Sequence, residues 1–475
     1  MATTTGATVD QASPDLRLTP ETYTTVDNLV KTTKDLVIPE LVETYGDQGI
    51  TGFLQLTGAV VSGGSSDQVD WWETGRRHRV IGGALASSAA GGTSNSPGTA
   101  VFTVDDTLSG DTTDSAIGLV QANDVLMNAD TGTRYIVNDA QTQADAQLKL
   151  ERLDGANGSP AEDGTTTKMI HLGNMYAQGT DQPSNFTDAD VIKRKNPFMI
   201  VKDRYQVNGS QATNIGWVNV GGGEFRWFMY GEQEARKRFE DRREMMLLFG
   251  EKNAATASHN GDNDLGKTIA GSEGYFSALE DRGINITNAN ANPLDSFAEF
   301  DDIIIELDKQ GAPAEYALYL NRKQDLAIDD MLASGISTGV TAGLPGQFGA
   351  FQNNADMAVQ LGFKSFTRGG YTFHKHDWKL LNDPTLLGAA TAFQGVMVPL
   401  ANVADPRTGN RAPSLAMYYK EANGYSREME HWVTGGGVLG HTNNGDGGKD
   451  VATFHYRSEV ALCVRAANQH VIIKG

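Results

Sequence analysis

EFRWFMYGEQEARKRFEDRREMMLLFG, residues 224–250, is the stretch of sequence that decides the fold. Its apolar side chains fall on one helical stripe, which contains Phe228, Ala235, Phe239, Met246 and Phe249. Glutamate precedes arginine by four positions at Glu232–Arg236 and again at Glu234–Arg238, and each such pair supports a helix by roughly 0.2–0.5 kcal/mol. The stretch therefore predicts one long helix that ends at its final glycine. Its charge pattern is typical of a structural support rather than an active site.

Composition sets the limits within which this helix must be interpreted. The chain has 475 residues, 54 glycines and a formal net charge of −20. That charge disfavours wrapping nucleic acid directly, but it suits a container whose inner wall does not grip its cargo. The single cysteine, Cys463, lies in an apolar stretch and predicts a buried, inert thiol. Neither a signal peptide nor a run of apolar residues long enough to span a membrane is evident, so we expect synthesis in the cytoplasm.

The N-terminal half is predicted to be mostly extended. Residues 1–48 are rich in Thr, Asp and Pro and form an arm without a core of its own. Strand-like sequence follows at 49–98 and returns at 173–220. Between these two parts, residues 99–172 contain short β-like runs separated by turn residues. This spacing predicts an inserted, separately folded β-module.

The C-terminal half mixes helices and strands. Residues 221–294 contain the long helix and a polar loop. Within 295–395, Ser296 and Glu299 form a capping box before an amphipathic helix, and strands follow, which predicts a compact α+β domain. The tail, residues 396–475, is β-rich and apolar. We expect it to complete a sheet that begins earlier in the chain.

Two glycine-containing patterns resemble catalytic or nucleotide-binding motifs. Residues 335–339 match G-x-S-x-G, with Ser337 in the nucleophile position. That motif needs a strand before it and a helix after it, whereas here a helix precedes it and a Gly-rich loop follows. Gly435, Gly437 and Gly440 match the dinucleotide pattern, but a loop follows them instead of the required helix. We interpret both matches as glycine-rich connections.

Two further groups resemble metal sites. His374 and His376 would share one face of a strand. A third ligand would have to come from His431, His441 or His455. Asp262 and Asp264 resemble a calcium loop, but Lys267 occupies the position that requires glycine. We favour half-exposed strand histidines and a solvated loop, so no metal, cofactor or catalytic residue is predicted and the chain is not expected to be an enzyme.

The basic residues of the long helix are interleaved with acids, which neutralise them, so a nucleic-acid-binding stripe is not expected there. We predict instead that these charges form ion pairs between identical subunits. The candidate inter-subunit residues are Glu232, Glu234, Arg236, Arg238, Arg242 and Arg243. Exposed pairs contribute little within one chain, but they fix the register between neighbours.

Taken in order, the segments resemble the major capsid proteins of tailed bacteriophages with the Hong Kong 97-like fold. The likeness extends over nearly the whole chain and rests on the order of elements, because that family has almost no residue-level motif. It implies an α+β fold with these parts: N-terminal arm 1–48, E-loop 49–98 and 173–220 with the insert 99–172, spine helix and P domain 221–294, A domain 295–395, and C-terminal P-domain sheet 396–475.

The resemblance also implies a function. Identical subunits would assemble into the pentamers and hexamers of an icosahedral virion shell that encloses double-stranded DNA without sequence-specific contact. Portal, scaffolding and decoration proteins are further partners implied by the family, and neither a membrane nor a cofactor is involved. Other virion parts, a tail tube or sheath, stay open as alternatives. A β-rich surface adhesin and a hydrolase that uses Ser337 fit the sequence less well.

Overall fold

A computed structural model describes most of the chain after the N-terminal arm. The described residues are 53, 57–76, 78, 80–87, 99–104, 120–140, 147–154, 165–183, 191–213, 227–253, 269–287, 294–341, 364–385, 393–404, 409, 411–435 and 450–475. The predicted arm, residues 1–48, lies outside this part. The fold is α+β, and the chain forms two compact units, Asp70–Lys195 and the residues that flank it on both sides.

The Asp70–Lys195 unit is built on a closed six-stranded barrel. Its strands, in spatial order, are β3 (Val80–Ser87), β4 (Thr99–Val104), β7 (Gln147–Arg152), β6 (Arg134–Ala140), β5 (Asp124–Asn128) and β8 (Thr165–Asn174). Buried Leu85, Phe102 and Tyr135 help to fill the interior. A side chain at Gly83 would bring a Cβ to 2.3 Å from the Thr103 carbonyl oxygen, so this position needs glycine.

The barrel begins earlier than residue 99, where the sequence placed the start of the inserted module. Strand β3, which was assigned to the E-loop, pairs with both β4 and β8 and is needed to close the barrel. The Gly/Ser-rich stretch after β3 was taken as a domain boundary. It instead connects two neighbouring strands of one barrel, which composition alone does not distinguish from a linker.

Two extended strands outside the barrel, β2 (Gln68–Thr74) and β9 (Val191–Pro197), pair with each other in a two-stranded sheet. We call this pair the ribbon. It joins the two regions in which the sequence predicted E-loop strands.

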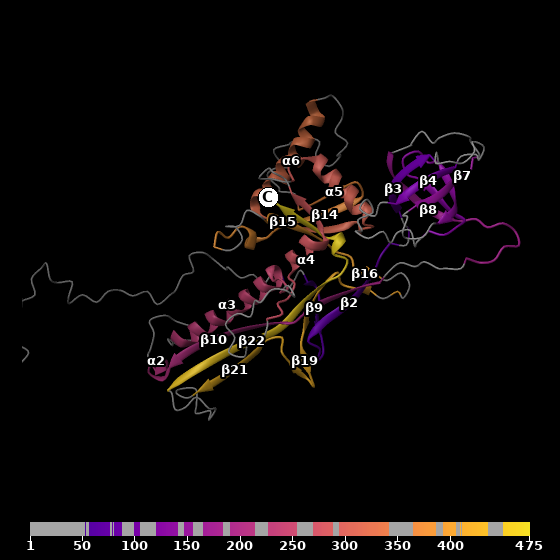
Figure 1. The fold of residues 1–475 in the computed structure, drawn as a ribbon. Coiled ribbons are helices and arrows are strands. Elements are labelled where there is room, and N and C mark those ends of the chain that lie inside the picture. Colours follow the sequence, from indigo (N-terminus) through magenta and orange to yellow (C-terminus); the bar gives the residue numbers. More distant parts are fainter. Residues whose placement is uncertain are drawn as a thin grey trace, which may run out of the picture. The chain divides into compact units, whose positions relative to one another are not determined.

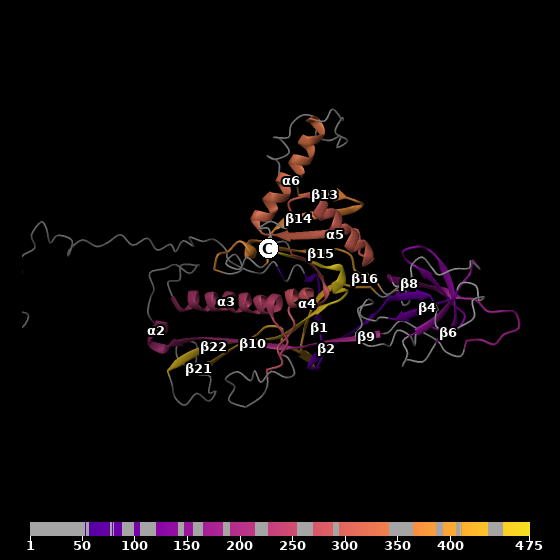
Figure 2. The same ribbon diagram turned by 45° about the horizontal axis from the view of Figure 1, so that its top comes forward.

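The other unit contains a five-stranded sheet and the long helix that packs on it. The strands are β1 (Val60–Ser62), β18 (Leu415–Tyr419), β22 (Val451–Val464), β10 (Met199–Asn208) and β21 (Glu430–Gly435). β10 runs antiparallel to β22, with Met199 opposite Val460 and Asn208 opposite Val451. The helix α3 (Trp227–Phe249) lies along this sheet, where Phe239 stacks on Tyr456 (Figures 1 and 2). The tail thus completes a sheet begun earlier in the chain, as predicted.

The same unit also contains a six-stranded sheet. Its order is β11 (Ile284–Thr287), β23 (Val471–Lys474), β15 (Gly395–Pro399), β12 (Glu315–Leu320), β14 (Tyr371–Asp377) and β13 (Ser365–Arg368). Three of these strands, β11, β23 and most of β15, come from outside the segment 295–395 that was predicted to form the domain. These short apolar strands pair with strands that are distant in the sequence. Local sequence patterns do not reveal such pairing, so the predicted boundaries of this domain were wrong.

The remaining elements accompany these two sheets. The helices are α2 (Gly209–Thr213), α4 (Tyr275–Arg282), α5 (Phe297–Lys309) and α6 (Arg322–Thr341), with short 3₁₀ turns at Lys379–Leu381 and Ala467–Gln469. Two small pairs are β16 (Val403–Ala404) with β17 (Arg411–Ala412), and β19 (Glu421–Ala422) with β20 (Tyr425–Ser426). The capping box of Ser296 and Glu299 at the start of α5 is confirmed.

The C-terminal end of α3 enters the main core between the sheets. Leu247 and Leu248 are buried there, and Phe249 stacks on Phe276 of α4 with 4.6 Å between ring centroids. Met246 is 44% exposed, so its place on the predicted buried stripe was wrong. The reason is that α3 packs on the sheet along its middle but also on α4 at its end, which moves the buried surface around the helix.

Candidate interaction surfaces

The exposed arginines of α3 contact acids of the same chain. Arg242 Nη1 lies 2.8 Å from Asp203 Oδ2 of β10, and Arg238 Nε lies 3.7 Å from the same oxygen. Arg236 Nε lies 3.1 Å from Glu240 Oε1. The helix-internal pairs predicted with Glu232 and Glu234 are therefore replaced by other partners, one of which comes from a strand far away in the sequence. These contacts tie α3 to the sheet beneath it.

The other candidate residues on α3 differ in their surroundings. Glu232 Oε1 lies 3.6 Å from His431 Nε2, and Glu234 is half-buried. Arg243 is buried, and its Nη1 donates a hydrogen bond of 3.4 Å to the Glu428 carbonyl oxygen. Burial within its own subunit contradicts an inter-subunit role for Arg243. For the exposed candidates, pairing between subunits stays a prediction.

Glu244 is the most unusual ionisable group on α3. Its side chain is fully buried, and neither carboxyl oxygen has a hydrogen-bond partner in the described part of the chain. Burial raises the pKa of this carboxyl to about 7, and the neighbouring Arg243 opposes the rise only in part. A carboxyl in such an apolar site holds its proton near neutral pH. In the sequence Glu244 is one of several acids interleaved with the basic residues of the helix, and no local pattern indicates its burial.

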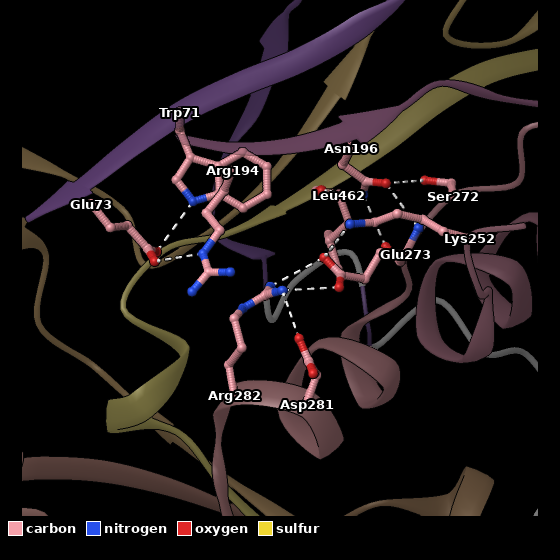
Figure 3. Close-up of polar contacts among 10 residues, drawn as sticks. All are labelled: Trp71, Glu73, Arg194, Asn196, Lys252, Ser272, Glu273, Asp281, Arg282 and Leu462. Carbon is pink, nitrogen blue, oxygen red and sulfur yellow. Dashed lines mark hydrogen bonds and ion pairs between the residues drawn. The ribbon is translucent and has the colours of Figure 1, made fainter. Parts of the chain in front are cut away.

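A buried polar network fixes the chain just before β10 (Figure 3). The Asn196 side-chain amide donates to the carbonyl oxygens of Glu273 and Leu462 at 3.0 and 2.7 Å, and its oxygen accepts from Glu273 N at 2.8 Å. The Glu273 carboxylate in turn accepts two bonds from Arg282, at 3.0 and 3.1 Å. These residues lie far apart in sequence, and no local pattern identified them.

The ribbon carries polar contacts on one face and an exposed aromatic ring on the other. Trp71 Nε1 donates to Glu73 Oε1 at 3.2 Å, and Arg194 Nε lies 3.5 Å from the other oxygen of the same carboxylate (Figure 3). On the opposite face Trp72 is 63% exposed, with Lys193 Nζ 5.5 Å from its ring centroid. Two strands alone are marginally stable, so this ribbon gains from being covered by another surface.

The two glycine-containing patterns lie partly in regular secondary structure. Ser337 lies within helix α6, so its segment does not form the strand-to-helix turn that a nucleophile elbow requires. Gly435 ends strand β21, while Gly437 and Gly440 fall outside the described residues. The first pattern is therefore part of a helix, and the second begins at the end of a strand.

The histidines that resemble metal ligands in the sequence lie on a strand without forming a metal site. His374 and His376 both lie on β14, and the His376 ring stacks on Tyr319 at 5.3 Å. Among the described residues no group of three His, Cys, Asp or Glu side chains is arranged to hold a metal ion. The calcium-like segment with Asp262 and Asp264 lies outside them. Cys463 is buried, as predicted.

None of the described helices is both long and apolar enough to cross a bilayer.

Comparisons with known proteins give matches only at the level of structure. No family model and no curated protein matches this sequence. The chain is similar to the solved structure of Mycobacterium phage Adephagia, at 8% identity over 94% of this chain and 97% of the other, with a TM-score of 0.37. It is also similar to the capsid of Cyanophage P-SCSP1u, at 10% identity over 64% and 80% of the two chains and a TM-score of 0.33.

A third match is the holo-SrpI encapsulin complex from Synechococcus elongatus, at 11% identity over 60% of this chain and 77% of the other, with a TM-score of 0.32. The matched structures are mostly phage capsids and encapsulins. At these TM-scores they superpose only loosely on this chain. Function is therefore best inferred from the chain's own residues.

Proposed function

We propose that this chain is a major capsid protein that assembles into the pentamers and hexamers of an icosahedral phage head around double-stranded DNA. In this proposal the ribbon is the stem of the E-loop, and the barrel is an insert within it. α3 is the spine helix of a P domain built on the five-stranded sheet, and the six-stranded sheet is the A domain. The protein has no catalytic role and resides in the virion.

The observation that carries this proposal is the ribbon. Lys193 reaches both Asp70 and Trp72, so these side chains share one face of it, and alternation along β9 adds Val191 to that face. Trp72 is 63% exposed and Val191 46% exposed. An extended pair of strands that offers an exposed tryptophan and valine is suited to lie on a neighbouring subunit, because an interface buries such groups at its centre.

Repetition turns a modest contact into a stable shell. Each copy of the ribbon buries little apolar area, but every subunit of a closed assembly both gives and receives such contacts. Dissociating one subunit then requires several contacts to break together, which makes the closed shell far more stable than any single interface. Trp72 and the ion pair between Lys193 and Asp70, at 2.7 Å, would set the register of the contact.

Negative-stain electron microscopy of the purified full chain tests the proposal. We expect closed shells or hexameric plates from the wild type. The double variant Trp72→Ser/Val191→Ser should fold, as judged by circular dichroism, but should form no shells. Its matched control is Val80→Ser/Leu153→Ser, which removes two apolar side chains of comparable exposure from the barrel.

Three results would contradict the proposal or change it. A wild-type chain that stays monomeric and hydrolyses an ester would exclude it. Open tubes in place of closed shells would favour a tail tube or sheath protein. Normal shells from the Trp72→Ser/Val191→Ser variant would show that the ribbon does not hold the assembly together.

A further inference from the structure

The two faces of the five-stranded sheet have different surroundings. Phe454 and Tyr456 of β22 pack against α3, and Asp203 of β10 contacts the arginines of that helix. Because side chains alternate along a strand, the residues between these point to the opposite side. Lys202 and Arg204 of β10 lie there, and both are exposed. We call this side of the sheet the distal face.

Two cations on the distal face stand opposite one another on neighbouring strands. The register of β10 with β22 places Lys202 directly opposite Arg457, and it places the nearby Arg204 opposite the imidazole of His455. Like charges in directly opposed positions destabilise a sheet. An anion bound across the two strands would remove that repulsion, so this arrangement suits a surface with an anionic ligand.

The acids of this region lie beneath the cations. Glu430 of β21 and Glu459 of β22 have side chains that are only 6% exposed. Glu430 contacts Arg457, and Glu459 lies 2.9 Å from Arg427 Nε. The two arginine side chains are 28% and 27% exposed, whereas their carboxylate partners are almost fully buried. On α3, by contrast, the acids that accompany the basic residues are not all buried.

An exposed aromatic ring lies within the same array. Trp432 of β21 stacks on His455 with 5.0 Å between ring centroids, and the Arg457 guanidinium lies 5.1 Å from the Trp432 ring centroid. These contacts hold the cation in place before any ligand arrives. Lys420 Nζ contacts two acids nearby, Asp67 at 2.5 Å and Glu459 at 3.5 Å.

We propose that the distal face binds the phosphate backbone of the enclosed double-stranded DNA, through Lys202, Arg204 and Arg457. This inference rests on the proposed shell function and specifies which surface meets the cargo. For this face it replaces the expectation, drawn from the net charge of −20, that the inner wall does not grip its cargo. Neighbouring strands lie about 4.8 Å apart and alternate residues of a strand about 6.7 Å apart, so the cations form a flat array of closely spaced charges. Duplex DNA offers phosphates about every 3.4 Å along each strand, so one segment supplies several to the array. A flat sheet reaches no base edges, which makes the contact independent of sequence.

Binding of a short random-sequence DNA duplex to the full chain, measured at several salt concentrations, tests the inference. The test variant is Lys202→Gln/Arg204→Gln, and the matched control is Lys237→Gln/Lys323→Gln, which removes the same charge from exposed residues of α3 and α6. Each lost phosphate contact lowers the slope of log affinity against log salt by about 0.9, so the test variant should lose about 1.8. The control should keep the wild-type slope. Lys202→Arg/Arg204→Lys should keep it too, because charge alone is required.

Electron microscopy of every variant separates this inference from the shell proposal. We expect closed shells from all of them. An unchanged slope in Lys202→Gln/Arg204→Gln, or a lower slope only in the control Lys237→Gln/Lys323→Gln, would overturn DNA binding by the distal face while leaving the shell intact. Folded Lys202→Gln/Arg204→Gln protein that forms no shells would assign the face to a second copy of the chain and also overturn the inference. Absence of shells in the wild type would instead exclude the shell function, whatever the slope.

Discussion

Replacing Glu244 by glutamine should stabilise the protein above neutral pH and have a much smaller effect in mild acid. The folded state raises the pKa of this buried carboxyl from 4.5 to about 7. Between these values the folded chain keeps a proton that the unfolded chain releases, so stability falls as pH rises through this window and then stays constant above it. Each factor of ten in proton affinity corresponds to about 1.4 kcal/mol, so the full effect is about 3 kcal/mol.

Glutamine has nearly the shape of the protonated side chain but cannot ionise. We therefore expect Glu244→Gln to raise the free energy of unfolding by about 3 kcal/mol at pH 8, and by only about 1 kcal/mol at pH 5.5. Urea unfolding followed by tryptophan fluorescence at both pH values provides the measurement. The slope of the unfolding free energy against urea concentration must be the same for wild type and Glu244→Gln. A change in the urea midpoint then reports a change in stability.

Glu234→Gln is the matched control, because Glu234 lies on the same helix but is only half-buried. Its effect should stay within about 0.5 kcal/mol at both pH values. The reasoning is refuted if Glu244→Gln changes stability by the same amount at pH 5.5 and pH 8. It is also refuted if the control shows the same pH dependence, since the effect would then belong to the net charge of the helix.

Three further predictions concern the buried network, the helix surface and the barrel. Asn196→Leu should destabilise the protein by about 3 kcal/mol or more in urea unfolding, because it leaves the buried carbonyls of Glu273 and Leu462 and the Glu273 N–H without partners; a loss below about 1 kcal/mol would mean that water replaces the amide. Arg238→Glu should impair shell formation in microscopy more than folding, since its contact with Asp203 is long and exposed and contributes at most about 1 kcal/mol; equal loss of both would refute its inter-subunit role. Deleting residues 80–174, with a short Gly/Ser connection, should leave shells that still form, whereas deleting only 99–172 should give insoluble protein because β3 keeps the apolar Ile81 and Leu85 without their barrel; soluble protein from the shorter deletion would contradict the barrel boundary.

Local features were predictable because their causes lie within a few residues of each other. The long helix was expected at 224–250 and spans Trp227–Phe249. Its closing glycine is needed because a Cβ at Gly250 would lie 2.4 Å from the Met246 carbonyl oxygen. The capping box before α5 and the strand pair β13–β14 follow equally from short-range pattern.

The candidate site was predicted less well, because the partners of a charged side chain depend on which surfaces meet. The helix supplied the right arginines, but their acidic partner Asp203 comes from β10, which no spacing on the helix could indicate. Glu244 reads as a surface acid in sequence and becomes a buried, proton-holding group only when other elements cover it. The charges of α3 also gave no indication that two exposed cations, Lys202 and Arg204, lie on the opposite face of the sheet.

The sequence by itself determined the kind and order of the elements: a long helix after extended strands, a β-rich insert, a mixed domain and a final sheet-forming tail. Hydrogen bonding within a helix, capping and the alternation of a strand are local, so the residues that cause them are neighbours in the chain. Only the tertiary structure decided that β10 pairs with β22, that β11 and β23 complete the six-stranded sheet, and that the barrel needs β3. Strand register and burial depend on contacts between distant segments, and their free energy appears only after those segments have come together.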